Sequence, residues 1–308
     1  MKKILFLLLG IVAAVSANAQ IVEVYENGTL IHRYNNTPAA KYTVKFKAPT
    51  NSETTIDGHD YVEIGGKKWA TMNVGATTVA GSPETAYGDY YAWGEKVTYY
   101  TKVDFTKTSG TSISWKGTNI TGAHINNNKF SHNWTCYSGT NSFKEWSTAP
   151  YGTDGVLNED CDVAQAQSSW GSSWRMPTKA DFDNLVKACC GSTSGYSEPA
   201  PDNGTIYTGG VYYIKEAGTT VDGVTYKVPG ILFVARIDTS KRLFFPAAGN
   251  LQTTTGNGQG TLCSYWASSL YSTDKSNAYY AHYSLINFSM GMLQTSRCKA
   301  LSIRPVSD

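Results

Sequence analysis

The chain has 308 residues, of which 41% are hydrophobic and 16% charged, with 26 Lys+Arg against 24 Asp+Glu. This near-neutral balance argues against nucleic acid as a partner, because such binders carry a basic excess that displaces counterions from phosphates. It argues equally against attachment to a membrane by charge. The length suits one large domain with a small appendage.

Residues 1–19 have the pattern of an export signal. Lys2 and Lys3 precede an apolar run from Ile4 to Val15, and a small-x-small pattern ends at Ala19. The run is shorter than the roughly 20 residues that span a bilayer, and no later segment is more apolar. We therefore expect no transmembrane segment and an exported mature chain beginning at Gln20, located in the periplasm, on the cell surface or in the medium.

Residues 20–50 read as a small β extension. Residues 21–34 alternate in polarity around Asn27-Gly28, which suits a two-residue hairpin turn, and residues 41–47 alternate again. Three short strands make at best a marginal independent unit, so we expect them to dock or to mediate assembly with another chain. A polar linker is expected over residues 51–60, followed by the main domain over residues 61–308.

The main domain is expected to open with a hairpin over residues 61–70, turning at two glycines. A long polar segment from Thr98 to Thr148 suggests loops. A helix is expected after Thr178, with Asp181 completing a capping box and Gly191 ending the helix. Its buried face is expected to hold Phe182, Leu185, Val186 and Cys189.

The last third of the chain returns to strands. They are expected at residues 231–237, 242–245, 265–268, 278–285 and 300–306. Along the fourth of these the two alternating faces differ little in polarity, so either face could carry a binding surface.

Six cysteines are present, without a CxxC pair, which argues against a zinc ribbon. In an oxidising compartment disulfides are expected, and the sequence does not choose their pairing. The alternative is that several cysteines are small buried hydrophobic residues.

Six motifs occur in order along the main domain. They are WATMNVGA (69–76), YGDYYAWGE (87–95), WGSSWRMPTKADFDNL (170–185), LFFPAAGN (243–250), YWASS (265–269) and SIRPV (302–306). Together they resemble the Fibrobacter succinogenes major paralogous domain family of exported Bacteroidetes proteins. The resemblance covers about residues 60 to 308.

This resemblance implies a C-type-lectin-like fold of the α+β, β-rich class, with short antiparallel sheets, one or two helices and long loops. Relatives of this fold include adhesins and pilus-tip components, and some vary their C-terminal surface residues. The motifs also supply the framework residues. Trp69, Trp93, Trp174 and Trp266 are expected in the core, and Arg175 and Arg304 in ion pairs with Asp89, Glu95 or Asp162.

Asp154, Glu159, Asp160 and Asp162 form the densest acidic cluster. Calcium takes six to eight oxygen ligands, so this loop is a candidate calcium site, with the capping of turns as the alternative. The Glu-Pro-Asn and Trp-Asn-Asp motifs of calcium-dependent sugar-binding lectins are absent. No other cofactor is indicated.

The segment from Tyr271 to Arg297 is the candidate binding surface, because aromatic, amide and methionine side chains suit adaptable recognition. Its candidate residues are Tyr271, Tyr280, His282, Asn287, Met290, Met292 and Gln294. The alternative is that these residues simply complete a sheet.

No HExxH, GxSxG or phosphate-binding glycine loop is present, and no catalytic residue is assigned. We expect an exported, non-enzymatic ligand-binding or adhesion module for a glycan or a protein. The first alternative is a structural or tip component of a surface assembly, joined through the N-terminal strands. The second, a glycan-modifying enzyme, requires paired carboxylates across a cleft.

Overall fold

The chain forms two compact units, Met1–Ser52 and Glu53–Asp308, in a computed structural model. The structure describes residues 55–96, 98, 151–165, 170–193, 197–202, 204–251, 257–297 and 299–308 in full, and the backbone of residue 166. It describes the backbone of residues 4–8, 11–15, 21–26, 29–35, 105–109, 112–115, 125–126, 129–130, 252 and 255–256.

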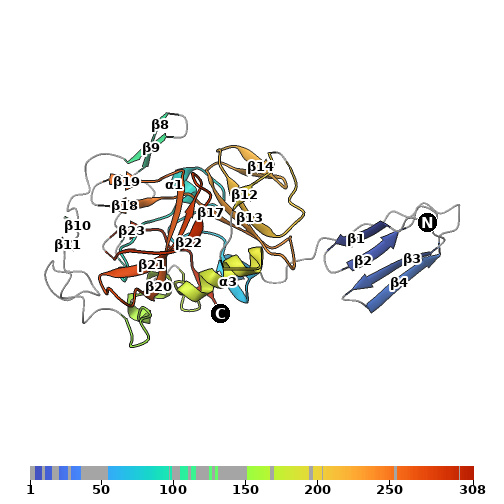
Figure 1. Cartoon of the computed structure of the whole chain (residues 1–308), viewed down its shortest axis with the longest axis horizontal. Coiled ribbons are helices and arrows are strands. Elements are labelled where there is room, and N and C mark those ends of the chain that lie inside the picture. Colours follow the sequence, from blue (N-terminus) through green and yellow to red (C-terminus); the bar gives the residue numbers. More distant parts are fainter. Residues whose placement is uncertain are drawn as a thin grey trace. The chain divides into compact units, whose positions relative to one another are not determined.

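The first unit contains a four-stranded antiparallel sheet in the order β1-β2-β3-β4 (Figure 1). Its strands are β1 (Ile4–Leu8), β2 (Ile11–Val15), β3 (Ile21–Glu26) and β4 (Thr29–Asn35). The hairpin predicted around Asn27-Gly28 is confirmed, because β3 pairs antiparallel with β4 across these residues. The assignment of residues 1–19 as a signal peptide stays a prediction, and residues 41–47 lie outside the described residues.

The second unit opens with β5 (Thr55–Ile56), β6 (His59–Ile64) and β7 (Lys67–Ala70). The predicted hairpin is confirmed, and Gly65 and Gly66 turn it with φ values of 67° and 77°, where glycine is favoured. Because β5 pairs with β6, part of the predicted linker belongs to this sheet. At the other end of the unit, β24 (Val306–Ser307) pairs with β7 and joins the last strand to the first hairpin.

Helix α3 (Lys179–Cys190) begins and ends where the sequence predicts. The Thr178 hydroxyl accepts the Asp181 backbone N–H, the Asp181 carboxylate accepts the Thr178 backbone N–H, and Gly191 ends the helix in the left-handed conformation. The four side chains expected on the inner face are buried. The capping box and the apolar spacing therefore determine this element locally.

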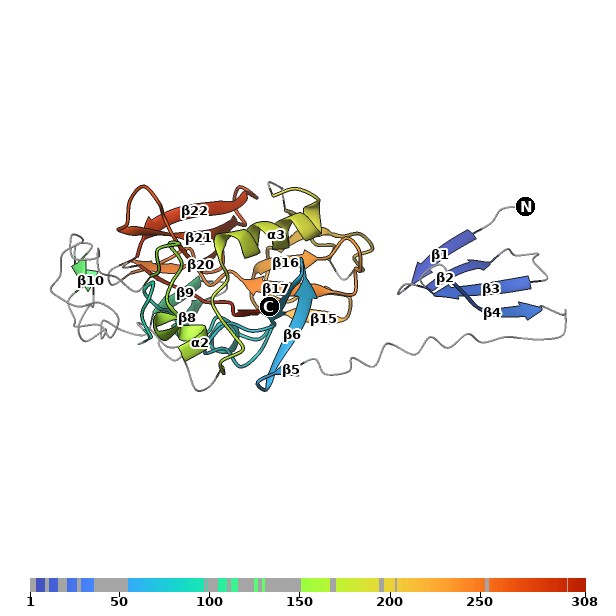
Figure 2. The same ribbon diagram turned by 90° about the horizontal axis from the view of Figure 1, so that it is seen from below.

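The remaining strands of the second unit form further short sheets, two of which contact α3 (Figures 1 and 2). One sheet contains β12 (Glu198–Pro199), β13 (Gly210–Ile214), β16 (Gly230–Val234) and β17 (Arg242–Pro246). A second contains β20 (Leu262–Leu270), β21 (Asn277–Ser284) and β22 (Met290–Ser296). A third contains β18 (Asn250–Gln252), β19 (Thr255–Asn257) and β23 (Ala300–Leu301).

Smaller elements complete the description. The pairs are β8 (Phe105–Ser109) with β9 (Ser112–Trp115), β10 (Ile125–Asn126) with β11 (Lys129–Phe130), and β14 (Thr219–Val221) with β15 (Val224–Tyr226). The short helices are α1 (Pro83–Ala86), η3 (Glu159–Cys161) and α2 (Val163–Ala166). The unit is thus α+β and rich in strands, and no described helix is long and apolar enough to cross a membrane.

Strands β16, β17, β20 and β21 fall where strands are predicted, with bounds that differ by a few residues. The single strand predicted over residues 300–306 is wrong, because the chain there forms two separate two-residue strands, β23 and β24, in different sheets. The sequence does not predict β12 to β15, β18, β19 or β22. These strands are short or carry little alternation, so tertiary pairing rather than local pattern specifies them. Most of the polar segment from Thr98 to Thr148 lies outside the described residues.

Four tryptophans are buried where framework roles are expected. Trp69, Trp93, Trp174 and Trp266 are each 0% exposed. Their indole N–H groups donate to the backbone carbonyls of Ile64, Ala267, Ile56 and Tyr91, respectively. Each ring therefore contributes apolar burial while its one polar group is satisfied.

Both interpretations that the sequence left open, a disulfide and a buried thiol, apply among the described cysteines. Cys161 is disulfide-bonded. Cys189 and Cys263 are free and buried, and Cys190 is free and half-buried. Burial raises the pKa of each free thiol, to about 12 for Cys189. These three cysteines therefore behave as small core residues rather than as thiolate nucleophiles.

Arg304 is completely buried, yet its guanidinium makes four hydrogen bonds. Its acceptors are Asn73 Oδ1 at 2.8 Å and the carbonyls of Ala70, Thr71 and Phe244 at 3.0, 2.8 and 2.9 Å. The guanidinium carbon also lies 4.5 Å from the centre of the Phe245 ring. Burial lowers the pKa of Arg304 to about 10, so the group remains charged at neutral pH.

The ion pairs predicted for the two arginines are corrected in part. Among the described residues Arg304 is hydrogen-bonded to oxygens of amides and carbonyls instead of a carboxylate, because these acceptors already surround its planar fork. Arg175 does form ion pairs, with Asp181 at 2.8 Å and Asp308 at 2.7 Å. The predicted partners Asp89, Glu95 and Asp162 form no ion pair with either arginine among the described residues, although the charge of Arg175 does act on the Asp162 carboxylate.

Replacing Arg304 with lysine should strongly destabilise the second unit. A single ammonium cannot reach all four acceptors, so buried carbonyls lose their donors and the free energy of unfolding should fall by about 3 kcal/mol or more. Urea denaturation of Arg304→Lys measures this. The exposed Arg236→Lys is the control, with an expected change within about 0.5 kcal/mol. Equal stability of both variants would contradict the role given to Arg304.

Removing the helix cap should have a smaller effect. Thr178→Ala deletes the hydroxyl that accepts the Asp181 N–H and should lower the free energy of unfolding by about 1 kcal/mol. The measurement is again urea denaturation. Thr239→Ala, in the turn between β16 and β17, is the matched control and should leave stability unchanged; a Thr178→Ala protein as stable as this control would refute the capping box.

Candidate functional site

The seven candidate binding residues do not form one surface. Register places Tyr280 opposite Leu293 and His282 opposite Gly291 on one face of the β20-β21-β22 sheet. The alternate face carries Ala281 opposite Met292, together with Met290 and Gln294. The expectation of a single binding surface is therefore corrected, because successive residues of a strand point to opposite faces.

The first face is aromatic and half-buried. The Tyr280 ring lies 6.3 Å from Trp266 and 5.8 Å from His282, both edge-on. Burial lowers the pKa of His282, which keeps the imidazole neutral at pH 7. Leu293, directly opposite Tyr280, is 44% exposed. Tyr280 and His282 are thus partly buried at the edge of the core and expose little surface to a ligand.

The second face packs toward α3. Met290, Met292 and Tyr279 are partly buried against the core cluster that contains Phe182 and Leu185 of the helix. Gln294 is exposed at the far end of the strand. Tyr271 meets the Tyr279 ring edge-on at 5.4 Å. The two methionines therefore fit the alternative interpretation of the sequence, in which these residues simply complete a sheet.

Asn287 belongs to a tight turn between β21 and β22. Its Oδ1 accepts the Ser289 backbone N–H at 3.3 Å and the Ser289 hydroxyl at 2.7 Å. At the start of the turn the Ser284 hydroxyl oxygen accepts the N–H groups of Ile286 and Asn287, at 3.3 and 3.4 Å. Asn287 therefore shapes the turn, and the residues on either side of it are presented outward.

The turn exposes one large apolar side chain and holds another in an unfavourable backbone conformation. Ile286 is 70% exposed. Phe288 has φ = +59°, a left-handed conformation that bulky residues seldom adopt and that costs on the order of 1–3 kcal/mol. One face of its ring stacks on Tyr213, with centres 4.4 Å apart and planes 21° apart. The local hydrogen bonds and this stacking hold Phe288 in place.

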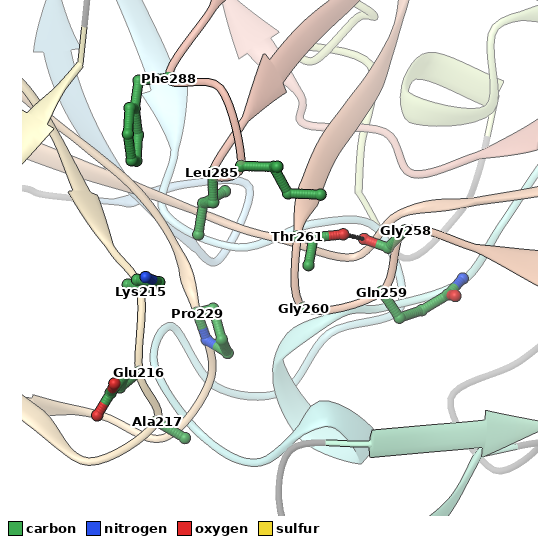
Figure 3. Close-up of a pocket in the computed structure, with 11 residues that line it drawn as sticks. Lys215, Glu216, Ala217, Pro229, Gly258, Gln259, Gly260, Thr261, Leu285 and Phe288 are labelled. Atoms are coloured by element: carbon green, nitrogen blue, oxygen red, sulfur yellow. Dashed lines mark hydrogen bonds between the residues drawn. The ribbon is translucent and has the colours of Figure 1, made fainter.

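This turn forms one wall of a pocket of about 780 Å³, within the range of small-molecule sites, roughly 300–1,000 Å³. Figure 3 shows Phe288, Lys215, Pro229 and Thr261 around one hollow. Its other lining residues are Glu216, Ala217, Gly258, Gln259, Gly260, Leu285 and Ile286. Buried Pro229 and Leu285 give apolar surface, while exposed Lys215 and Glu216 supply opposite charges.

The expectation from the sequence places Asn287 in a candidate binding segment but includes neither this turn nor its pocket. Asn287 and Ser289 favour a tight turn, and this local signal predicts outward display of Ile286 and Phe288. The loop from Lys215 to Ala217 and the turn from Gly258 to Thr261 meet this turn only in the folded chain. No local pattern could indicate that approach.

The acidic cluster does not assemble as a metal site. Asp154 Oδ1 accepts the Val156 N–H at 3.0 Å, which is the turn-capping alternative. Asp162 is buried and accepts the N–H groups of Ala164 and Met176 at 2.8 and 2.7 Å. Within the described part of the chain, which includes Glu159 and Asp160, no group of three or more His, Cys, Asp or Glu could hold a metal ion.

Asp162 is instead a buried structural carboxylate. Burial raises its pKa to about 6, against the usual 3.8, although its backbone hydrogen bonds and the charge of Arg175 act in the opposite direction. The folded chain therefore binds this proton more tightly than the unfolded chain does. Stability from this group should rise as pH falls from above 6 toward 4.

This linkage can be measured with Asp162→Asn. The free energy of unfolding of the original chain minus that of the variant should increase by about 2 kcal/mol between pH 7 and pH 4.5, because only the original chain takes up the proton. Urea denaturation across this range gives both values. Asn158→Gln, at an exposed neighbouring position, removes no titratable group and should give a flat difference. A difference that stays constant or falls for Asp162→Asn would contradict the raised pKa.

Comparison with known proteins gives no further assignment, since no family model, curated protein or solved structure matches the chain.

Proposed function

We propose that the chain is an exported, non-enzymatic ligand-binding or adhesion module. In this proposal the turn from Ser284 to Ser289 and the adjoining pocket bind a glycan or a protein outside the cytoplasm. The observation that carries the proposal is the preformed turn, which holds Phe288 at a positive φ and leaves Ile286 70% exposed. Strained backbone and exposed apolar side chains concentrate at binding sites.

The chemistry of the pocket suits recognition. Pro229, Leu285 and Phe288 offer apolar surface to the C–H face of a sugar ring or to an apolar side chain. Lys215, Glu216 and Thr261 at its border can exchange hydrogen bonds with hydroxyl or peptide groups. The two charges have opposite sign, which favours a ligand without strong net charge.

The proposed fold is a variant of the C-type-lectin-like fold. Three features support this proposal: the pairing of β24 with β7, a helix capped within the motif WGSSWRMPTKADFDNL, and short antiparallel sheets. The motifs YWASS and SIRPV come before and after the candidate turn in the sequence. Membership of the Fibrobacter succinogenes major paralogous domain family and export by the leader are parts of the same proposal.

Binding to arrays of glycans, mucins and extracellular proteins, with and without calcium, tests the function. We expect a specific signal from the original chain that falls by about tenfold or more in both Phe288→Ala and Ile286→Ser, because each deletes an apolar contact at the centre of the site. Val224→Ser, on β15, removes another exposed apolar side chain, outside the pocket lining, and should bind like the original.

Thermal unfolding of each variant shows whether its fold is intact. Silence on every array, or binding by folded Phe288→Ala and Ile286→Ser equal to that of Val224→Ser, would overturn the proposed site. Loss of signal only after calcium removal would instead point to a metal-dependent site elsewhere in the chain.

A further inference from the structure

Strand β22 lies at the edge of its sheet. The sheet has the order β20-β21-β22, and β22 pairs with β21 over all seven of its residues without a bulge. Figure 2 shows β22 at the outer rim of the second unit. On the opposite edge, β20 is covered by backbone hydrogen bonds to Gly155, Pro177 and Ser302. Within the described residues, residues 290–295 of β22 pair with no strand other than β21, and the Ser296 carbonyl at the end of β22 accepts the Lys299 N–H.

Other edges of the described sheets of this unit are protected in the ways that prevent strand addition. Strand β12 has two residues and contains Pro199, β5 and β24 have two residues each, and β19 has three. Strand β17 begins with Arg242 and ends with Pro246. Strand β22 has none of these devices, since it is long, regular and free of both proline and charge.

The side chains of β22 leave room for a neighbouring strand. Leu293, at the centre of the seven residues, is one of the large hydrophobic side chains that remain exposed, at 44%. Gly291 has no atom within 4 Å of the position where a Cβ would lie. An added strand would therefore cover Leu293 and meet no bulky side chain at Gly291.

We propose that β22 is the strand along which two copies of this chain join, antiparallel and related by a two-fold axis at Leu293. Antiparallel overlap centred on Leu293 places this side chain opposite its counterpart, which reduces the exposure of both to water. Because the strand is uncharged and the chain has a formal net charge of only +2, self-pairing brings no like charges together. A second copy thus pairs its own exposed Leu293 with that of the first and meets no charge repulsion at this edge.

Antiparallel pairing would also set the distance between the two pocket turns of a dimer. The pocket turn precedes β22 directly, so antiparallel pairing would place the two turns at opposite ends of the paired strands, about 24 Å apart along the strand direction. A dimer could then engage two sites of one ligand and gain avidity. The pairing itself does not depend on the proposed function of the pocket.

Sedimentation velocity of the full chain over a concentration series tests the proposal. The original chain should shift toward twice the monomer mass as concentration rises. Leu293→Lys should weaken this association at least about tenfold, because the two-fold axis brings two ammonium groups together. Val224→Lys adds the same charge at a comparably exposed position on β15 and should associate like the original chain.

Mixing two variants of opposite charge distinguishes a loss of strand pairing from a loss of folding. Leu293→Lys and Leu293→Glu should each be monomeric alone and should form a dimer when mixed, because position 293 faces itself only in the two-fold arrangement. A monomeric original chain at every concentration, a dimer unaffected by Leu293→Lys, or folded variants that fail to associate on mixing would each overturn the proposal. A monomer that captures an extended segment of a different protein at β22 would overturn it as well.

Discussion

The hydrogen bonds of one buried guanidinium constrain most of the second unit. Arg304 lies two residues before β24, yet its acceptors belong to the end of β7, the loop that follows β7 and strand β17. Burying a charge without partners is costly, so the fold is stable only when all of these segments converge on Arg304. Among its acceptors, Asn73 extends the network by donating to the Tyr87 carbonyl and the Tyr265 hydroxyl.

This convergence explains how short sheets make a stable frame. None of them has the size to stand alone, but β7, β17 and β20 are connected through Asn73, Tyr265 and Arg304. The Tyr265 hydroxyl donates to the Pro246 carbonyl at 2.6 Å, which closes the connection between β20 and β17. From this frame β20 leads to β21 and then to the turn at Ile286 and Phe288. The frame thus supplies the rigidity that a preformed binding turn requires.

The sequence predicts those features that depend on neighbouring residues. Thr178, Asp181 and Gly191 define α3 by local hydrogen bonding, and glycines define the hairpin of β6 and β7. Features that depend on contacts between distant parts of the folded chain are not predictable from neighbouring residues. The alternation along β21 does not show that Ala281 faces α3 while Tyr280 faces Trp266. The sequence therefore predicts one surface for seven candidate residues that belong to two faces of the sheet and a turn. The positive φ of Phe288 and the neutral acceptors of Arg304 likewise arise from tertiary contacts.

Amide hydrogen exchange of the whole chain tests most directly whether the Arg304 network is the rigid frame of the unit. The backbone N–H groups of Ala70, Val74 and Trp266 donate to Pro305, Ile303 and Ser302, on either side of Arg304. These amides should be among the slowest to exchange, because they open only when the frame unfolds. The amides of Ile286 and Asn287, held only by a serine hydroxyl, should exchange much faster. Exchange at Ala70, Val74 and Trp266 as fast as at Ile286 would contradict this account.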